Sequence, residues 1–101
     1  MKTGIFSFLI LFFSAETFAQ EKSIPEIDNL LSKSEKLANL NVDSALNYAF
    51  KAAELSEKKN DSSCIAKSYV AIGNLYDNMD EADNAVTYYQ KSFNASKNLQ
   101  A

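Results

Sequence analysis

Residues 71–93 read AIGNLYDNMDEADNAVTYYQKSF, and this stretch decides the fold. Apolar and aromatic residues recur on both sides of the acidic turn Met79-Asp80-Glu81 at the three-to-four spacing of an amphipathic helix. Gly73 lies inside the first of these two patterns, although Gly costs roughly 1 kcal/mol relative to Ala in a helix interior. The stretch therefore predicts two helices joined by a short turn, and a glycine whose presence needs a physical reason.

Outward from this hairpin, the chain after residue 24 reads as helix throughout, with no alternating strand-like run. We expect helices over about 25–38, 42–59, 62–78 and 82–99. Ser23 and Glu26 have capping-box spacing before the first helix, and Asn41 or Asp43 can cap the second. Connections this short predict antiparallel neighbours, so the fold class is all-α, built from stacked helical hairpins.

Each predicted helix has a face that we expect to point inward. In the second helix this face is made of small residues, and in the third and fourth it is aliphatic and aromatic. The second helix contributes Ala45, Leu46, Ala49, Ala52 and Ala53; the third contributes Ile65, Tyr69, Ile72, Gly73 and Tyr76; the fourth contributes Ala85, Val86, Tyr89 and Phe93.

The N-terminus has the three parts of a secretory signal peptide. Lys2 is positively charged, residues 5–13 are an apolar run, and Thr17-Phe18-Ala19 places small residues before a cleavage site. The run is far shorter than the about 20 residues that span a bilayer. We therefore expect residues 1–19 to be cleaved after Ala19, residues 20–24 to be a short linker, and the chain to be exported to the periplasm or secreted.

Composition argues against several functional classes. The net charge is −3, and the sequence contains neither His nor Arg, so it has no basic patch for nucleic acid. No glycine-rich loop, Cys pair or Ser beside a base is present, so we expect no catalytic residue, no metal, no cofactor and no enzyme activity. Cys64 is the only cysteine, which rules out a disulfide within this chain, and we expect it to pack as a small apolar residue.

The acidic stretch from Asp77 to Asp83 invites comparison with a calcium loop. An EF-hand loop needs Gly at its sixth position and Glu at its twelfth, whereas Ala82 and Tyr88 stand there. A helix end followed by an acidic first turn explains the same residues, because carboxylates favour helix N-termini.

The second and fourth helices repeat one pattern at an offset of 40 residues, with Ala45/Ala85, Tyr48/Tyr88 and Lys51/Lys91 identical. A fixed offset built from helix pairs is typical of an α-solenoid. The spacing of its best-preserved unit resembles the tetratricopeptide-repeat (TPR) family, in the 40-residue variety found in bacterial signalling proteins. The residues that carry this resemblance are Tyr69, Ile72, Gly73, Tyr76, Ala85 and Tyr89. Ser92 and Lys97 depart from the family pattern, and Asp80 stands where Gly is common.

The resemblance implies a TPR helix pair over residues 61–101 and a degenerate or capping pair over 25–60. It implies that Gly73 meets Ala85 where the two helices approach most closely. It also implies a concave groove that binds a peptide or protein segment. The candidate groove residues are Lys67, Ser68, Asn74, Asp77 and Asn78. Tyr48 and Tyr88 fall beside the predicted core stripe, so we also expect them nearer the surface and accessible to a partner.

Two functional hypotheses follow. In the first, the chain is an exported, non-catalytic protein-interaction module. In the second, it is the N-terminal part of a larger sensor histidine kinase or membrane-tethered transcriptional regulator, whose extracytoplasmic TPR region senses a signal. Membrane attachment would then come only from an uncleaved signal sequence or a missing C-terminal part. Val86 and Phe93 are expected to be incompletely covered, so self-association through the terminal hairpin is a third possibility.

Overall fold

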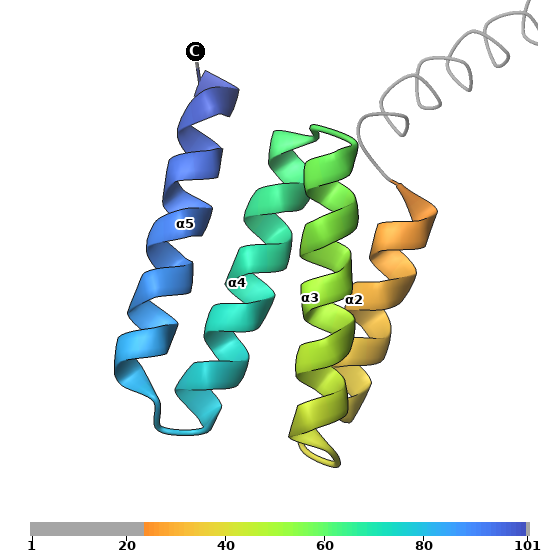
Figure 1. The fold of residues 1–101 in the computed structure, drawn as a ribbon, viewed down its shortest axis with the longest axis vertical. Coiled ribbons are helices and arrows are strands. Elements are labelled where there is room, and N and C mark those ends of the chain that lie inside the picture. Colours follow the sequence, from red (N-terminus) through yellow and green to blue (C-terminus); the bar gives the residue numbers. More distant parts are fainter. Residues whose placement is uncertain (1–23, 101) are drawn as a thin grey trace, which may run out of the picture.

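A computed structural model describes residues 24–100, and the predicted signal peptide lies outside this range. The described chain forms four helices: α2 (Pro25–Leu37), α3 (Val42–Lys58), α4 (Ser62–Asn78) and α5 (Ala82–Gln100). They run alternately up and down and are joined by tight turns (Figure 1). The all-helical class is confirmed, and each helix ends within one residue of its predicted end.

Side-chain caps begin two of the helices, and the one at Asn41 was predicted from the sequence. The Asn41 side chain accepts a hydrogen bond from the Ser44 backbone N–H at 3.1 Å, and Asp61 does the same for the Cys64 N–H at 3.0 Å. At α2 the residue before the helix is Ile24, which has no capping side chain. The expected Ser23 capping box is therefore not at the observed N-cap, and Ser23 itself lies outside the described residues.

The turns after α3 and α4 share one backbone conformation. Asn60 has a φ of 55° and Asp80 a φ of 62°, both in the left-handed region. The N–H of the following residue bonds back to the carbonyl five residues earlier, at 3.2 Å from Asp61 to Ser56 and at 2.9 Å from Glu81 to Tyr76. This is the Schellman arrangement, and Asn and Asp are the residues besides Gly that tolerate its left-handed position.

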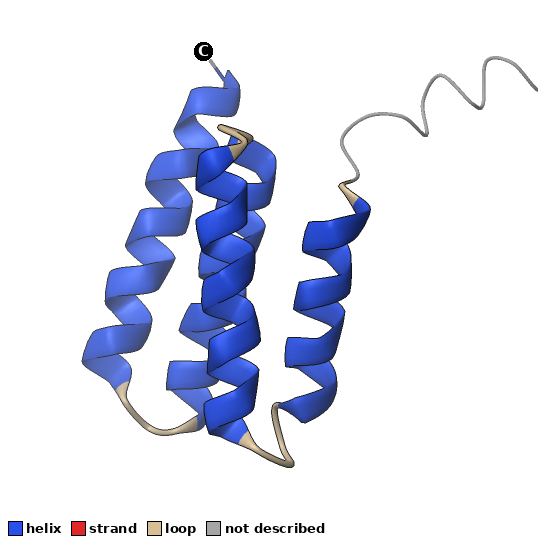
Figure 2. Cartoon of the chain, turned by 45° about the vertical axis from the view of Figure 1, so that its right-hand side comes forward, coloured by secondary structure: helices blue, strands red, loops and turns tan. Residues whose placement is uncertain are grey.

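Helix α4 is central to the packing, since it contacts each of the other three helices. It lies between α3 and α5 in Figure 1, whereas α2 stands beside α3 and is best separated in Figure 2. Helices α3 and α5 have no close backbone contact with each other. The second hairpin is therefore attached to the first through its own first helix.

The core is built mainly from small side chains. Ala45, Ala49 and Ala52 in α3 are fully buried, and together with Ala53 they allow neighbouring helices to approach closely. Ile27 and Ile72 are the largest fully buried side chains among the described residues. The predicted small-residue face of α3 is thus confirmed as core.

Buried serines complete the contacts between helices. Ser34 of α2 donates a hydrogen bond to the Ala45 carbonyl at 2.9 Å, and Ser92 of α5 donates one to the Ala66 carbonyl of α4, also at 2.9 Å. Ser92 occupies the position where the repeat pattern prefers Ala. It remains small and buried, and its hydroxyl joins α5 to α4, so this departure from the pattern is structurally mild.

The inward face of α5 differs from the prediction. Ala85 is 2% exposed and Ser92 is 6% exposed, whereas Val86 and Phe93 are 53% and 62% exposed. The expectation that these two apolar residues share the inward face with Ala85 is therefore wrong, while their expected incomplete cover is confirmed. Because the backbone of α5 closely approaches that of α4 alone, only one side of this helix is covered.

Candidate functional site

A groove of about 380 Å³ runs between α2 and α4, the first helices of the two hairpins. Apolar side chains from both helices line most of it, and polar side chains stand among them. The apolar lining residues are Leu31, Ala38, Val70, Ala71 and Leu75, and the polar ones are Ser34, Glu35, Lys67, Asn74 and Asn78.

Three of the five predicted groove residues, Lys67, Asn74 and Asn78, line this groove. Asp77 is exposed but does not line it. Ser68 is fully buried and lies 3.3 Å from the Ser56 hydroxyl of α3, so its assignment to the groove is wrong. Successive residues of a helix differ in direction by 100°, which turns Ser68 toward α3 when Lys67 faces α2.

Lys67 connects the two walls of the groove. Its Nζ lies 3.5 Å from Oδ1 of Asp28 in α2, and both side chains remain largely exposed. An ion pair in this setting contributes little to stability, about 0–1 kcal/mol. It does place a cation at the edge of the groove, where the sequence predicted Lys67, whereas the Asp28 partner was not predicted.

Asn74 has a fixed orientation because Tyr89 of α5 donates its hydroxyl proton to Asn74 Oδ1 at 2.6 Å. The amide NH₂ of Asn74, which can donate two hydrogen bonds, is then the part of the side chain that a groove ligand can use as a donor. Tyr89 is 37% exposed, so it is a partly solvated residue beside the groove rather than the interior residue that we expected.

The glycine at position 73 packs against that same tyrosine. A Cβ at Gly73 would lie 2.6 Å from Cε1 and 2.7 Å from Cδ1 of Tyr89. Gly73 thus lies where α4 and α5 approach closely, but its nearest neighbour is the Tyr89 ring and not Ala85, as the resemblance implied. Ile72 and Ala85, the other aliphatic signature residues, are both buried.

Tyr88 forms the centre of an aromatic cluster that joins α3, α4 and α5. Its ring stacks on Tyr76 at 5.6 Å and 15°, and it meets Phe50 edge-on at 5.8 Å and Tyr69 at 5.9 Å. Lys91 Nζ lies 5.5 Å from the Tyr88 ring centroid. Tyr88 is therefore half-buried, and the expectation that it lies near the surface and accessible to a partner is wrong, because this cluster packs against the core.

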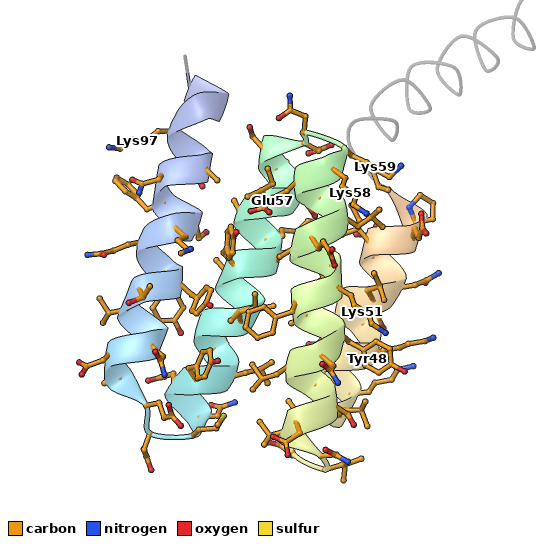
Figure 3. The ribbon with its side chains drawn as sticks, viewed as in Figure 1. Tyr48, Lys51, Glu57, Lys58, Lys59 and Lys97 are labelled. Atoms are coloured by element: carbon orange, nitrogen blue, oxygen red, sulfur yellow. The ribbon has the colours of Figure 1, made fainter. Side chains whose placement is uncertain are left out.

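Tyr48 lies at the equivalent position of the first hairpin and carries the equivalent lysine. Lys51 Nζ is 5.7 Å from the Tyr48 ring, and Lys33 approaches the same ring at 5.5 Å. Figure 3 shows Tyr48 and Lys51 together on the α2 side of α3. The sequence signal for the Lys51–Tyr48 and Lys91–Tyr88 pairs is the Tyr-x-x-Lys spacing present in both hairpins.

Three described side chains have a raised pKa: Tyr69, Cys64 and Tyr76, whose pKa is raised mainly by burial. Burial, followed by a hydrogen bond to Glu57, raises the pKa of Tyr69 to about 12. Burial, followed by the nearby Asp61 carboxylate, also raises the pKa of the Cys64 thiol above its usual value. Cys64 is fully buried, as predicted, and such a thiol is held in its unreactive protonated form.

The described residues do not assemble a metal centre. Between residues 24 and 100, no three His, Cys, Asp or Glu side chains converge closely enough to hold an ion. Within the same range, no helix combines the length and apolar character that a membrane span requires. What the groove offers chemically is an apolar floor with amide, ammonium and carboxylate groups at its edges.

Comparison of the sequence with protein-family models, with curated proteins and with solved structures gives no match.

Proposed function

We propose that this chain is a non-catalytic, exported protein-interaction module of the TPR type, which binds an extended peptide segment between α2 and α4. The observation that carries this proposal is the groove itself. It has an apolar floor that includes Leu31, Val70 and Leu75, and hydrogen-bonding groups at Asn74 and Asn78. A shape of this kind suits a chain segment that buries apolar side chains and leaves backbone amides to be paired.

The helix packing supports the repeat architecture. In stacked hairpins, the first helix of one pair contacts both helices of the preceding pair, and α4 contacts α2 and α3 in this way. Gly73 lies at a close approach between α4 and α5, and Ala85 of α5 is buried, in keeping with the small residues of the TPR pattern at these two positions.

The two asparagines suggest how the peptide would be held. Asn74 and Asn78 are four residues apart on α4, which places them about 6 Å apart along the helix axis. Alternate residues of an extended peptide repeat at about 6.6 Å. Two amide side chains on α4 can therefore meet two successive backbone groups that point to the same side of a bound strand.

The experiment begins with selection of peptides from a random displayed library. The affinity of each selected peptide is then measured by fluorescence polarisation, with the concentration of this chain kept at or below about 1 µM. We expect Val70→Glu, which puts a carboxylate into the groove, to weaken binding roughly tenfold or more. Val86→Glu is the matched control, because Val86 lies on α5 outside the groove and has a similar exposure, 53% against 41% for Val70.

Failure to enrich any peptide would contradict the proposal, as would equal binding by the wild type and Val70→Glu. Export is tested separately by N-terminal sequencing of the chain recovered outside the cytoplasm. That sequence should begin at Gln20, and a chain that retains Met1 would contradict cleavage.

A further inference from the structure

One side of α5 has an apolar stripe that remains largely exposed. Val86 and Phe93 are seven residues apart, so they lie on the same side of the helix, and they are 53% and 62% exposed. Gln90 lies between them and is also exposed. This side is turned by about 100° around the helix axis from Ala85 and Ser92, which face α4, so it flanks the α4 contact. It is separate from the groove between α2 and α4.

Charged residues lie at both ends of the stripe with opposite signs. Asp83 is in the first turn of α5 and Lys97 is in the last, and both side chains are exposed. Lys97 Nζ lies 5.1 Å from the Phe93 ring, so the ammonium group is held on the stripe itself. Figure 3 shows Lys97 near the C-terminal end of α5, at the opposite end of the molecule from the acidic turn that precedes this helix.

The apolar and charged residues along this stripe are self-complementary when the α5 helix of a second copy runs antiparallel to the first. If two α5 helices are placed antiparallel about a two-fold axis near Gln90, Val86 of each copy faces Phe93 of the other. Lys97 of each copy then lies within one turn of Asp83 of the other. A parallel arrangement would instead place Asp83 beside Asp83 and Lys97 beside Lys97. The charges and the opposed helix dipoles therefore both select the antiparallel pair.

We propose that a second copy of this chain covers the stripe, forming a two-fold symmetric dimer through antiparallel α5 helices. From Ala82 to Lys97 the contact strip is about 22 Å long and about 10 Å wide. Such a strip covers roughly 200 Å² on each copy, well below the about 800 Å² per partner of a standard interface, so the dimer is weak, with a dissociation constant of roughly 10–1,000 µM.

The test is sedimentation equilibrium of the full chain from about 5 to about 500 µM, with circular dichroism to verify that each variant is folded. We expect the wild type to shift from monomer toward dimer over this range. Phe93→Glu should raise the dissociation constant roughly tenfold or more, because it puts a carboxylate at each of the two symmetric contacts. Leu40→Glu is the matched control: Leu40 is 80% exposed in the turn between α2 and α3, and this variant should dimerise like the wild type.

The orientation is tested by exchanging the charges. Asp83→Lys and Lys97→Glu should each weaken the dimer, and the double variant should recover to within roughly threefold of the wild type, because the pair is restored with its signs reversed. Strictly monomeric wild type at the highest concentration would overturn the proposal. Dimerisation that Phe93→Glu leaves unchanged would place the contact on another surface, the N-terminal apolar run included. A double variant as weak as either single one would overturn the antiparallel arrangement.

Discussion

Replacing Gly73 by Ala should destabilise this protein, and the sign of the effect should reverse when Tyr89 is absent. Gly73 does not have a positive φ, so its backbone accepts any helical residue. In an open helix the substitution would therefore stabilise by about 1 kcal/mol. In this hairpin the new methyl group meets the Tyr89 ring at 2.6 and 2.7 Å, well inside the about 3.5–4.0 Å of a favourable carbon contact.

The size of the expected destabilisation follows from the contacts that Tyr89 loses. Its ring has to move outward by about 1 Å, which breaks the hydroxyl contact to Asn74, worth about 1 kcal/mol. If about 60 Å² more of the ring becomes exposed, a further ~1.5 kcal/mol is lost at about 25 cal/mol per Å². Subtracting the helix-propensity gain leaves a net destabilisation of about 1–2 kcal/mol.

The assay is a double-mutant cycle by urea denaturation, followed by circular dichroism, with Gly73→Ala, Tyr89→Ala and the double variant. In the Tyr89→Ala background the methyl group has open space, so Gly73→Ala should stabilise by about 1 kcal/mol. The change in unfolding free energy caused by Gly73→Ala should thus differ by about 2–3 kcal/mol between the two backgrounds. If Gly73→Ala changes the unfolding free energy equally in both backgrounds, the close contact of Gly73 is not with Tyr89, and this prediction is wrong.

Two further predictions concern a tyrosine and a turn. An unfolded tyrosine titrates near pH 10, whereas burial and the Glu57 hydrogen bond raise the pKa of Tyr69 to about 12. The folded chain therefore keeps a proton that the unfolded chain has lost, so this contribution to stability is complete below about pH 10 and disappears as the pH rises toward 12. Tyr69→Phe should show a shallower loss of unfolding free energy over that interval, and an unchanged slope would argue against this role. At Asp80, whose φ is 62°, Gly should raise the unfolding free energy by about 0.5–1 kcal/mol, and Val should lower it by about 1–2 kcal/mol. Thermal melts of the two variants measure this, and a Val variant as stable as the wild type would contradict a left-handed residue at this turn.

The sequence by itself determined the bounds of the four helices to within one residue, although the cap expected at Ser23 is not the observed N-cap of α2. Capping oxygens at Asn41 and Asp61 and left-handed residues at Asn60 and Asp80 act within a few residues of the chain, so their effect can be inferred without knowing the fold. The alanine face of α3 and the burial of Cys64 also followed from local pattern, because small apolar residues at helical spacing fit only a close helix contact.

Only the tertiary structure decided how each helix is rotated about its own axis. Helical periodicity fixes the angle between two residues of one helix, but it does not fix which of them faces the neighbouring helix. That is why Tyr88 and Tyr89 exchanged their expected environments, and why Ser68 is in the interior although Lys67 lines the groove. The rotation of α5 follows from contacts between residues far apart in sequence: Ser92 with the Ala66 carbonyl, and the Tyr89 ring on Gly73. These contacts also turn Val86 and Phe93 outward, so the exposed stripe on α5 is a product of packing rather than of any local signal.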